Sequence, residues 1–274
     1  MIVKVCNADY SLQWDGMYQF ALENYPQIQE WELEKLAKFI AYEQDYHRQT
    51  IVECENLELK IQIHDYLQEH SFFPPYRPSH QLVASTYDVQ KKLVTSNYCS
   101  HTCTVEVAQA IFQTGKLMSA VKVFGKSGAE LVTDSRNAAS DPADYFDYIM
   151  FGWSNTTSGY RLAMERLLGR APSEEELQEK FIPGVSFHFL YEELIQAPGY
   201  MFDGYHVAKV RDSLDLDTFL HLCVIPSKDK ACFEGLIPSQ LQDRVIYLDY
   251  EGEGLQAWNT KVNQVLHGKD KLKE

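Results

Sequence analysis

Hydrophobic and polar residues along the chain follow two periods, one typical of strands and one typical of helices. Alternation over two residues predicts strands at Met1–Asn7, Thr50–Cys54, Leu82–Ser85, Tyr98–Cys103, Tyr148–Phe151, Gly184–Leu190, Tyr205–Lys209, Leu220–Ile225 and Arg244–Leu248. Apolar spacings of two to four residues predict helices at Trp14–Tyr25, Glu30–Tyr46, Leu57–Leu67, Val105–Thr114, Arg161–Leu167, Ser173–Lys180 and Tyr191–Gln196. Strands and helices alternate, so the pattern predicts an α/β or α+β protein.

A proline-rich segment divides this pattern. Phe72–Pro78 carries three prolines in five residues, and proline withholds a backbone donor and disfavours helix before it. We therefore expect a small N-terminal α/β unit over residues 1–75, an extended linker, and a second domain over residues 80–268. The strand–helix–strand–helix order of the first unit favours parallel pairing. The second domain is expected to hold a mixed or split sheet with helices.

Composition narrows the functional classes. The 274 residues include 45% hydrophobic and 23% charged residues, which is ordinary for a globular protein. No run of about 18 apolar residues occurs, which argues against a membrane span. The net charge of −14 argues against nonspecific nucleic-acid binding, because such surfaces need clustered lysine and arginine. Six scattered cysteines and a rapidly polar N-terminus favour a reduced, cytoplasmic protein without a signal peptide.

An ordered set of short segments lies in the second domain. Its members are Ser100-His101-Thr102, Gly115-Lys116-Leu117, Asp147–Phe151, Val185–Leu194, Phe202–His206 and Leu222–Pro226. Their order and spacing over residues 98–250 resemble the NAD-binding half of the DarT-like ADP-ribosyltransferases.

That resemblance implies a fold, a substrate and a set of binding residues. The fold would be the mixed, split sheet of the ADP-ribosyltransferase superfamily, and the substrate would be NAD. His101 and Thr102 correspond to groups that hold the ribose or the nicotinamide amide, and we expect Tyr148 in the same cleft. Arg161 corresponds to an arginine that binds the NAD phosphates, with Arg136 as an alternative. The acceptor of ADP-ribose would be a nucleobase or a protein side chain, and the protein a toxin or defence enzyme.

The catalytic carboxylate of that family is missing from the matching strand. Phe219–Val224 contains no acid, and His221 is its nearest polar group. Cleavage of the bond to nicotinamide develops positive charge on the ribose, so a nearby carboxylate would accelerate it. Asp203 is our first candidate for that carboxylate and Glu193 our second. His221 is an imidazole and is never negative near neutral pH.

Other interpretations stay open beside this one. The chain could be an inactive binding or regulatory module with the same fold, as the missing carboxylate indicates. It could also be a metal-dependent hydrolase, because Cys99, His101 and Cys103 would share one strand face. Structural zinc sites usually show two close cysteine pairs, so we assign no metal ligand and expect these cysteines to be core residues. No phosphate-binding loop and no Gly-x-Ser-x-Gly motif occurs.

Overall fold

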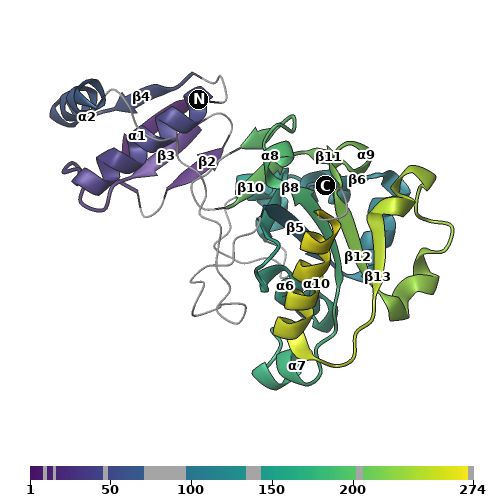
Figure 1. Cartoon of the computed structure of the whole chain (residues 1–274). Coiled ribbons are helices and arrows are strands. Elements are labelled where there is room, and N and C mark those ends of the chain that lie inside the picture. The colour runs from purple at the N-terminus through teal and green to yellow at the C-terminus, as the bar shows by residue number, and fades with distance from the viewer. Residues whose placement is uncertain are drawn as a thin grey trace. The chain divides into compact units, whose positions relative to one another are not determined.

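The computed structural model describes residues 1–8, 11–14, 17–45, 49–70, 97–133, 143–201 and 206–270. Its contacts divide the chain into two compact units, Met1–Ser79 with Met201–His206, and His80–Tyr200 with Val207–Glu274. Each unit is built around a sheet with helices, so the chain has the α/β class that the sequence predicts (Figure 1). The expected linker and the expected strand Leu82–Ser85 lie outside the described residues.

The N-terminal unit contains four strands and two helices. They are β1 (Ile2–Cys6), β2 (Leu12–Trp14), β3 (Met17–Ala21), α1 (Glu30–Asp45), β4 (Ile51–Cys54) and α2 (Leu57–Glu69). The strand order is β2-β3-β1-β4, and β1 runs parallel to both β3 and β4. The parallel pairing of β1 with β4 confirms the prediction for this unit.

The helix predicted at Trp14–Tyr25 is wrong, because this segment forms parts of two strands. β2 and β3 pair antiparallel, and Trp14 stands opposite Met17. Tyr18, Phe20 and Leu22 are buried at every second position, which is the period of a strand. The dipeptide Asp15-Gly16 favours a two-residue hairpin, and this sequence signal argues against a helix.

The C-terminal unit is built on a seven-stranded sheet. Its order is β13 (Val245–Leu248), β12 (Leu222–Pro226), β8 (Val185–Leu190), β5 (Tyr98–Cys103), β7 (Tyr148–Trp153), β10 (Ala208–Arg211) and β9 (Tyr200–Met201). β13 runs parallel to β12, while β12–β8, β8–β5, β5–β7 and β7–β10 are antiparallel. The sheet is therefore mixed. A separate ribbon pairs β6 (Lys116–Met118) with β11 (Ser213–Asp215).

Helices cover both faces of this sheet. α6 (Ser158–Leu168), α7 (Glu174–Gln178) and α10 (Gly254–Asp270) share one apolar core with Tyr98 and with Leu222 and Val224 of β12 (Figure 1). On the other face, Phe112 of α3 (Val105–Thr114) packs against Phe187 at 5.4 Å between ring centroids. Val185–Phe189 of β8 and all of β12 are buried, because helices pack on both faces of the sheet here.

The remaining elements are short. They are α4 (Ala120–Phe124), α5 (Gly128–Val132), α8 (Tyr191–Leu194), α9 (Leu216–Phe219) and the 3-10 helices η2 (Ala143–Asp147), η3 (Ser227–Phe233) and η4 (Ser239–Arg244). No helix of the described residues is long and apolar enough to cross a membrane.

Candidate functional site

The central strand β5 parts from its neighbour β7 in the middle of its length. β5 pairs with β8 over all six of its residues, from Tyr98 opposite Leu190 to Cys103 opposite Val185. With β7 it pairs at two positions, Cys99 opposite Trp153 and Ser100 opposite Gly152. Beyond Ser100 the ladder to β7 ends. His101 is the first residue past this point, which we call the strand split.

His101 bridges the strand split with its side chain. The ring is partly exposed, and its Nδ1 lies 3.4 Å from the carbonyl oxygen of Met150 on β7. A carbonyl only accepts, so this contact requires the proton on Nδ1 and leaves Nε2 as an acceptor. Burial lowers the pKa of His101, although the bond to Met150 opposes part of that shift. His101 is therefore a neutral imidazole at pH 7 that can accept a hydrogen bond from a ligand.

Thr102 lies on the opposite face of β5, under the first turn of α6. A Cβ added to Gly159 would stand 2.8 Å from Oγ1 of Thr102 and 3.1 Å from its Cβ. The helix thus approaches the strand as closely as it does because residue 159 has no side chain. Thr102 and His101 belong to the same end of β5, but they face different layers of the domain.

The N-terminus of α6 carries no side-chain cap. Thr157 is the N-cap residue and makes no capping hydrogen bond. The hydroxyl of Thr156 donates instead to the carbonyl of Trp153 at 2.7 Å. The first backbone N–H groups of an 11-residue helix are therefore left to solvent or a ligand, at the positive end of the helix dipole. Arg161 is exposed in the same turn, so this end of α6 is suited to an anion.

Tyr148 is engaged by a buried lysine. Its side chain is 5% exposed, and Nζ of Lys209 lies 4.4 Å from its ring centroid and 5.2 Å from that of Tyr145. Lys209 itself is fully buried on β10, opposite Met150 of β7. Sequence reasoning missed Lys209, because a lysine on a strand is ordinarily exposed. The predicted contact of Tyr148 with a ligand stays a prediction.

The structure does not bring the candidate residues Glu193 and His221 to the strand split. Glu193 is exposed in α8, which follows Leu190, and Leu190 pairs with Tyr98 at the start of β5. His101, at the strand split, is three residues further along β5 from Tyr98, about 10 Å. The His221 ring lies 5.0 Å from the Tyr98 ring, at that same far end. Asp203 lies outside the described residues.

A buried polar network underlies α6, and sequence reasoning missed it. Both ring nitrogens of His188 meet serine hydroxyls, Nδ1 with Ser154 at 2.9 Å and Nε2 with Ser186 at 2.8 Å. The Ser186 hydroxyl also lies 2.7 Å from the Tyr160 hydroxyl. Burial, followed by the nearby His221, lowers the pKa of His188 to about 3. His188 is thus a neutral structural residue, and the polar positions 186 and 188 inside an apolar strand were its only sequence signal.

The cysteines beside His101 are core residues. Cys99 and Cys103 are buried, and burial raises the pKa of both thiols. A protonated thiol is a poor metal ligand and a poor nucleophile. Across the described ranges, no group of three or more His, Cys, Asp or Glu side chains is arranged to hold a metal ion. All six cysteines are free thiols.

The candidate site therefore has a neutral histidine at the strand split, with an uncapped helix N-terminus and an exposed arginine on the other face of β5. His101 and Thr102 are neighbours on β5, and Gly159, two residues before Arg161, lies against Thr102, while Glu193 and His221 lie towards the Tyr98 end of β5. That His101, Thr102 and Arg161 bind one ligand stays a prediction. Comparisons of the chain with protein-family models, with curated proteins and with solved structures found no match.

Proposed function

We propose that the C-terminal unit binds NAD at the strand split and transfers its ADP-ribose to an acceptor, a nucleobase or a protein side chain, in the cytoplasm. The observation that carries this proposal is the His101 acceptor nitrogen at the point where β5 leaves β7, with the uncapped α6 N-terminus on the other face of the same strand. The resemblance of residues 98–250 to the DarT-like ADP-ribosyltransferases supports the same ligand.

Each part of NAD would meet a group suited to it. The diphosphate would accept hydrogen bonds from the first N–H groups of α6 and from the Arg161 guanidinium, whose planar fork fits two phosphate oxygens. A ribose hydroxyl or the nicotinamide amide would donate to Nε2 of His101. These contacts bind and orient the substrate. They do not by themselves stabilise the charge that develops when its glycosidic bond breaks.

The reaction breaks the bond between the ribose carbon and the nicotinamide nitrogen, and nicotinamide leaves with the bonding electrons. A nucleophilic atom of the acceptor then bonds to that carbon and loses a proton to a base. A carboxylate facing the ribose would stabilise the cation-like transition state. Asp203 is our candidate for this carboxylate, because Glu193 lies at the far end of β5.

The second candidate function is an inactive module that binds NAD or a related nucleotide without turning it over. The observation that favours it is the position of Glu193 and His221, which leaves neither of them near His101. Both functions predict the same nucleotide contacts. They differ in whether nicotinamide is released.

Isothermal titration of the whole protein with NAD tests the binding step. We expect Arg161→Ala and His101→Ala to weaken binding by about tenfold each. The first variant loses a charge-assisted hydrogen bond to phosphate, and the second loses a neutral hydrogen bond. Arg166→Ala is the matched control, because Arg166 is exposed in the last turn of the same helix. The proposal fails if NAD does not bind, or if the control weakens binding as much as Arg161→Ala.

Nicotinamide release separates the two functions. With nucleic acid and protein offered as acceptors, an active enzyme should release nicotinamide, and Asp203→Asn should slow release by about 10²-fold with NAD affinity almost unchanged. Binding without any release would assign the inactive module. Equal activity of wild type and Asp203→Asn would show that the carboxylate is a different residue.

A further inference from the structure

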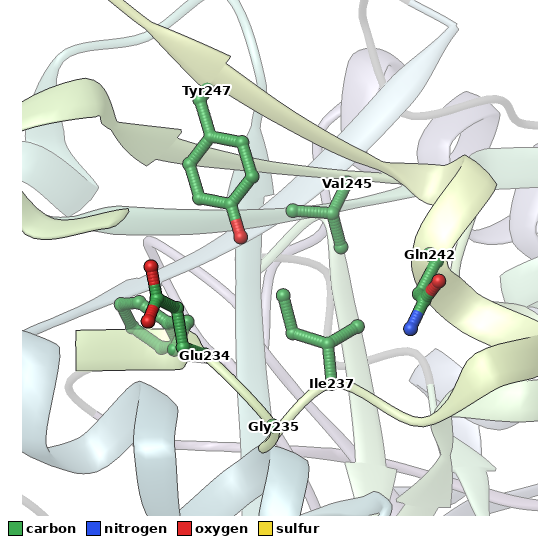
Figure 2. Close-up of a pocket in the computed structure, with 7 residues that line it drawn as sticks. Glu234, Gly235, Ile237, Gln242, Val245 and Tyr247 are labelled. Atoms are coloured by element: carbon green, nitrogen blue, oxygen red, sulfur yellow. The ribbon is translucent and has the colours of Figure 1, made fainter. Parts of the chain in front are cut away.

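A second candidate binding site lies on the C-terminal unit, in the connection between η3 and η4. An open pocket of about 270 Å³ lies between this connection and β13 (Figure 2). Its lining consists of Phe233, Glu234, Gly235, Ile237, Gln242, Val245 and Tyr247. None of these residues belongs to the strand split, so the pocket is independent of the proposed NAD site.

The base of the pocket is apolar and fixed. Phe233 is 1% exposed, and its ring packs edge to face on Phe112 of α3 at 5.9 Å. Val245 and Tyr247 are two residues apart on β13 and so project from the same face of the sheet. Ile237 faces them from the η3–η4 connection (Figure 2). An apolar stem of a ligand would bury its surface here.

Gly235 forms the turn at one wall of the pocket. Gly235 adopts a φ of +75°, a conformation that other residues rarely take, and no atom lies within 4 Å of the place where its Cβ would be. A side chain at this position would project into open space. The glycine is therefore required by the turn that forms one wall.

Among the seven lining residues, Glu234 alone carries a formal charge, and it is negative. Figure 2 shows the Glu234 carboxylate and the Tyr247 hydroxyl directed into the same space, with the Gln242 amide on the far side. In the part of the chain that the structure describes, no lysine, arginine or histidine forms an ion pair with Glu234. The pKa of Tyr247 is raised by burial, then by the Cys223 thiol and the Glu234 charge, so its hydroxyl stays protonated and neutral.

The Tyr247 ring already holds a cation on one side. Nζ of Lys230 lies 5.2 Å from its centroid, within the range of a cation–π contact. An ammonium group bound next to Glu234 would find the same electron-rich ring and a carboxylate oxygen within one small space. The net charge of −14 would raise the local concentration of cations around the protein as a whole.

We propose that this pocket binds an organic cation, an alkylammonium or alkylguanidinium group on an apolar stem of about four atoms. The stem lies on Phe233, Ile237 and Val245, and the charged group meets Glu234 and Tyr247. Two sources supply this chemistry, a free amine and the lysine or arginine side chain of a polypeptide. The pocket is open at Glu234 and Gln242, which are both exposed, so either source can enter.

The test is a titration of the whole protein, at low ionic strength, followed through the amide NMR signals of Gly235 and Ile237. The free probes are n-butylammonium and n-butylguanidinium, with 1-butanol as the neutral analogue of the same size. The polypeptide probes are acetyl-Gly-Lys-Gly-amide and the same peptide with norleucine in place of lysine. We expect the charged probes to bind in the millimolar range and the neutral ones at least about fivefold more weakly.

Three variants make the titration decisive. Glu234→Gln should weaken the charged probes by about fivefold and bring them level with the neutral ones, and Ile237→Trp should abolish binding by filling the pocket. Glu251→Gln removes one exposed charge elsewhere and should leave affinity unchanged. Preference for the free amine or for the peptide identifies the source, and both results support the site. Binding by neither, or equal binding of charged and neutral probes to wild type and Glu234→Gln, overturns it.

Discussion

At the residue scale, His188 makes the stability of the protein depend on pH. Its pKa is about 3 in the folded protein, against an ordinary value near 6.5 in the unfolded chain. Between these values the unfolded chain binds the extra proton, so acidification favours unfolding. The contribution of His188 is complete above pH 6.5 and is lost progressively as the pH falls towards 3.

We therefore expect the free energy of unfolding to fall by about 2 kcal/mol between pH 7 and pH 5 through His188 alone. Urea unfolding at a series of pH values measures this slope. His188→Gln keeps hydrogen-bonding capacity towards Ser154 and Ser186 but does not titrate, so its slope over this interval should be smaller. His101 has a lowered pKa too and will leave part of the slope in place. Equal slopes for wild type and His188→Gln would contradict the assignment.

Tyr148 offers a second prediction at this scale. Its buried ring lies against the Lys209 ammonium, so truncation would open a cavity and remove the ring that faces a buried charge. Tyr148→Ala should cost about 3–5 kcal/mol of stability, whereas Tyr148→Phe keeps the ring and should cost about 1 kcal/mol. Thermal or urea unfolding compares the two. A large loss in Tyr148→Phe would show that the hydroxyl, and not the ring, is the stabilising group.

At the element scale, the contact between α6 and β5 depends on Gly159. A valine here would bring its Cβ to 2.8 Å from the Thr102 hydroxyl oxygen, a separation that forces the helix or the strand to move. Gly159→Val should therefore destabilise the protein by about 1–3 kcal/mol. It should also weaken NAD binding if the α6 N-terminus holds the diphosphate. Urea unfolding and NAD titration of one protein sample measure both effects.

Two further variants identify the cause of that loss. Gly268→Ala is the control, because Gly268 is also helical but has no atom near its Cβ position, and it should stabilise the protein by about 0.5–1 kcal/mol. Thr102→Ala removes the oxygen that a residue-159 side chain would meet. Combined with Gly159→Val it should restore part of the lost stability, and a strictly additive double variant would argue against a direct clash.

At the scale of the whole molecule, three of the six free cysteines, Cys99, Cys103 and Cys223, report on the opening of the seven-stranded sheet. Cys232 is exposed and Cys6 and Cys54 are partly buried, whereas Cys99, Cys103 and Cys223 are buried in the sheet with raised pKa values. A thiol reagent attacks the thiolate. Cys99, Cys103 and Cys223 should therefore react slowly, because they are buried and because they stay protonated. Native protein should expose three reactive thiols and denatured protein six.

The rate at which Cys99, Cys103 and Cys223 react should follow the opening of the sheet, through its rate when labelling outpaces reclosing and through the open population otherwise. It should therefore rise with urea in parallel with global unfolding, while labelling of Cys232 should not change. Labelling followed by mass spectrometry assigns each site. Reaction of Cys99, Cys103 or Cys223 as fast as Cys232 in native protein would contradict the burial of these strands.

Local patterns in the sequence were sufficient to predict those elements whose residues follow a single period. β5 and α3 were predicted with their observed ends. For α3, Thr104 is the N-cap and Gly115 the C-cap, and both are local signals of where a helix begins and ends. The Trp14–Tyr25 segment shows the limit of this reasoning. Its apolar residues fit both periods in a short window, and pairing with β1 decided for the strand.

The candidate site depended far more on tertiary structure. The sequence singled out His101, Thr102 and Arg161 through the resemblance of an ordered set of short segments to the DarT-like ADP-ribosyltransferases, and their binding role stays a prediction. Only the fold decided that β5 leaves β7 at His101, that Glu193 lies at the other end of β5, and that Lys209 is buried against Tyr148. These are contacts between residues far apart in the chain. Their geometry follows from strand order and register, which no local periodicity contains.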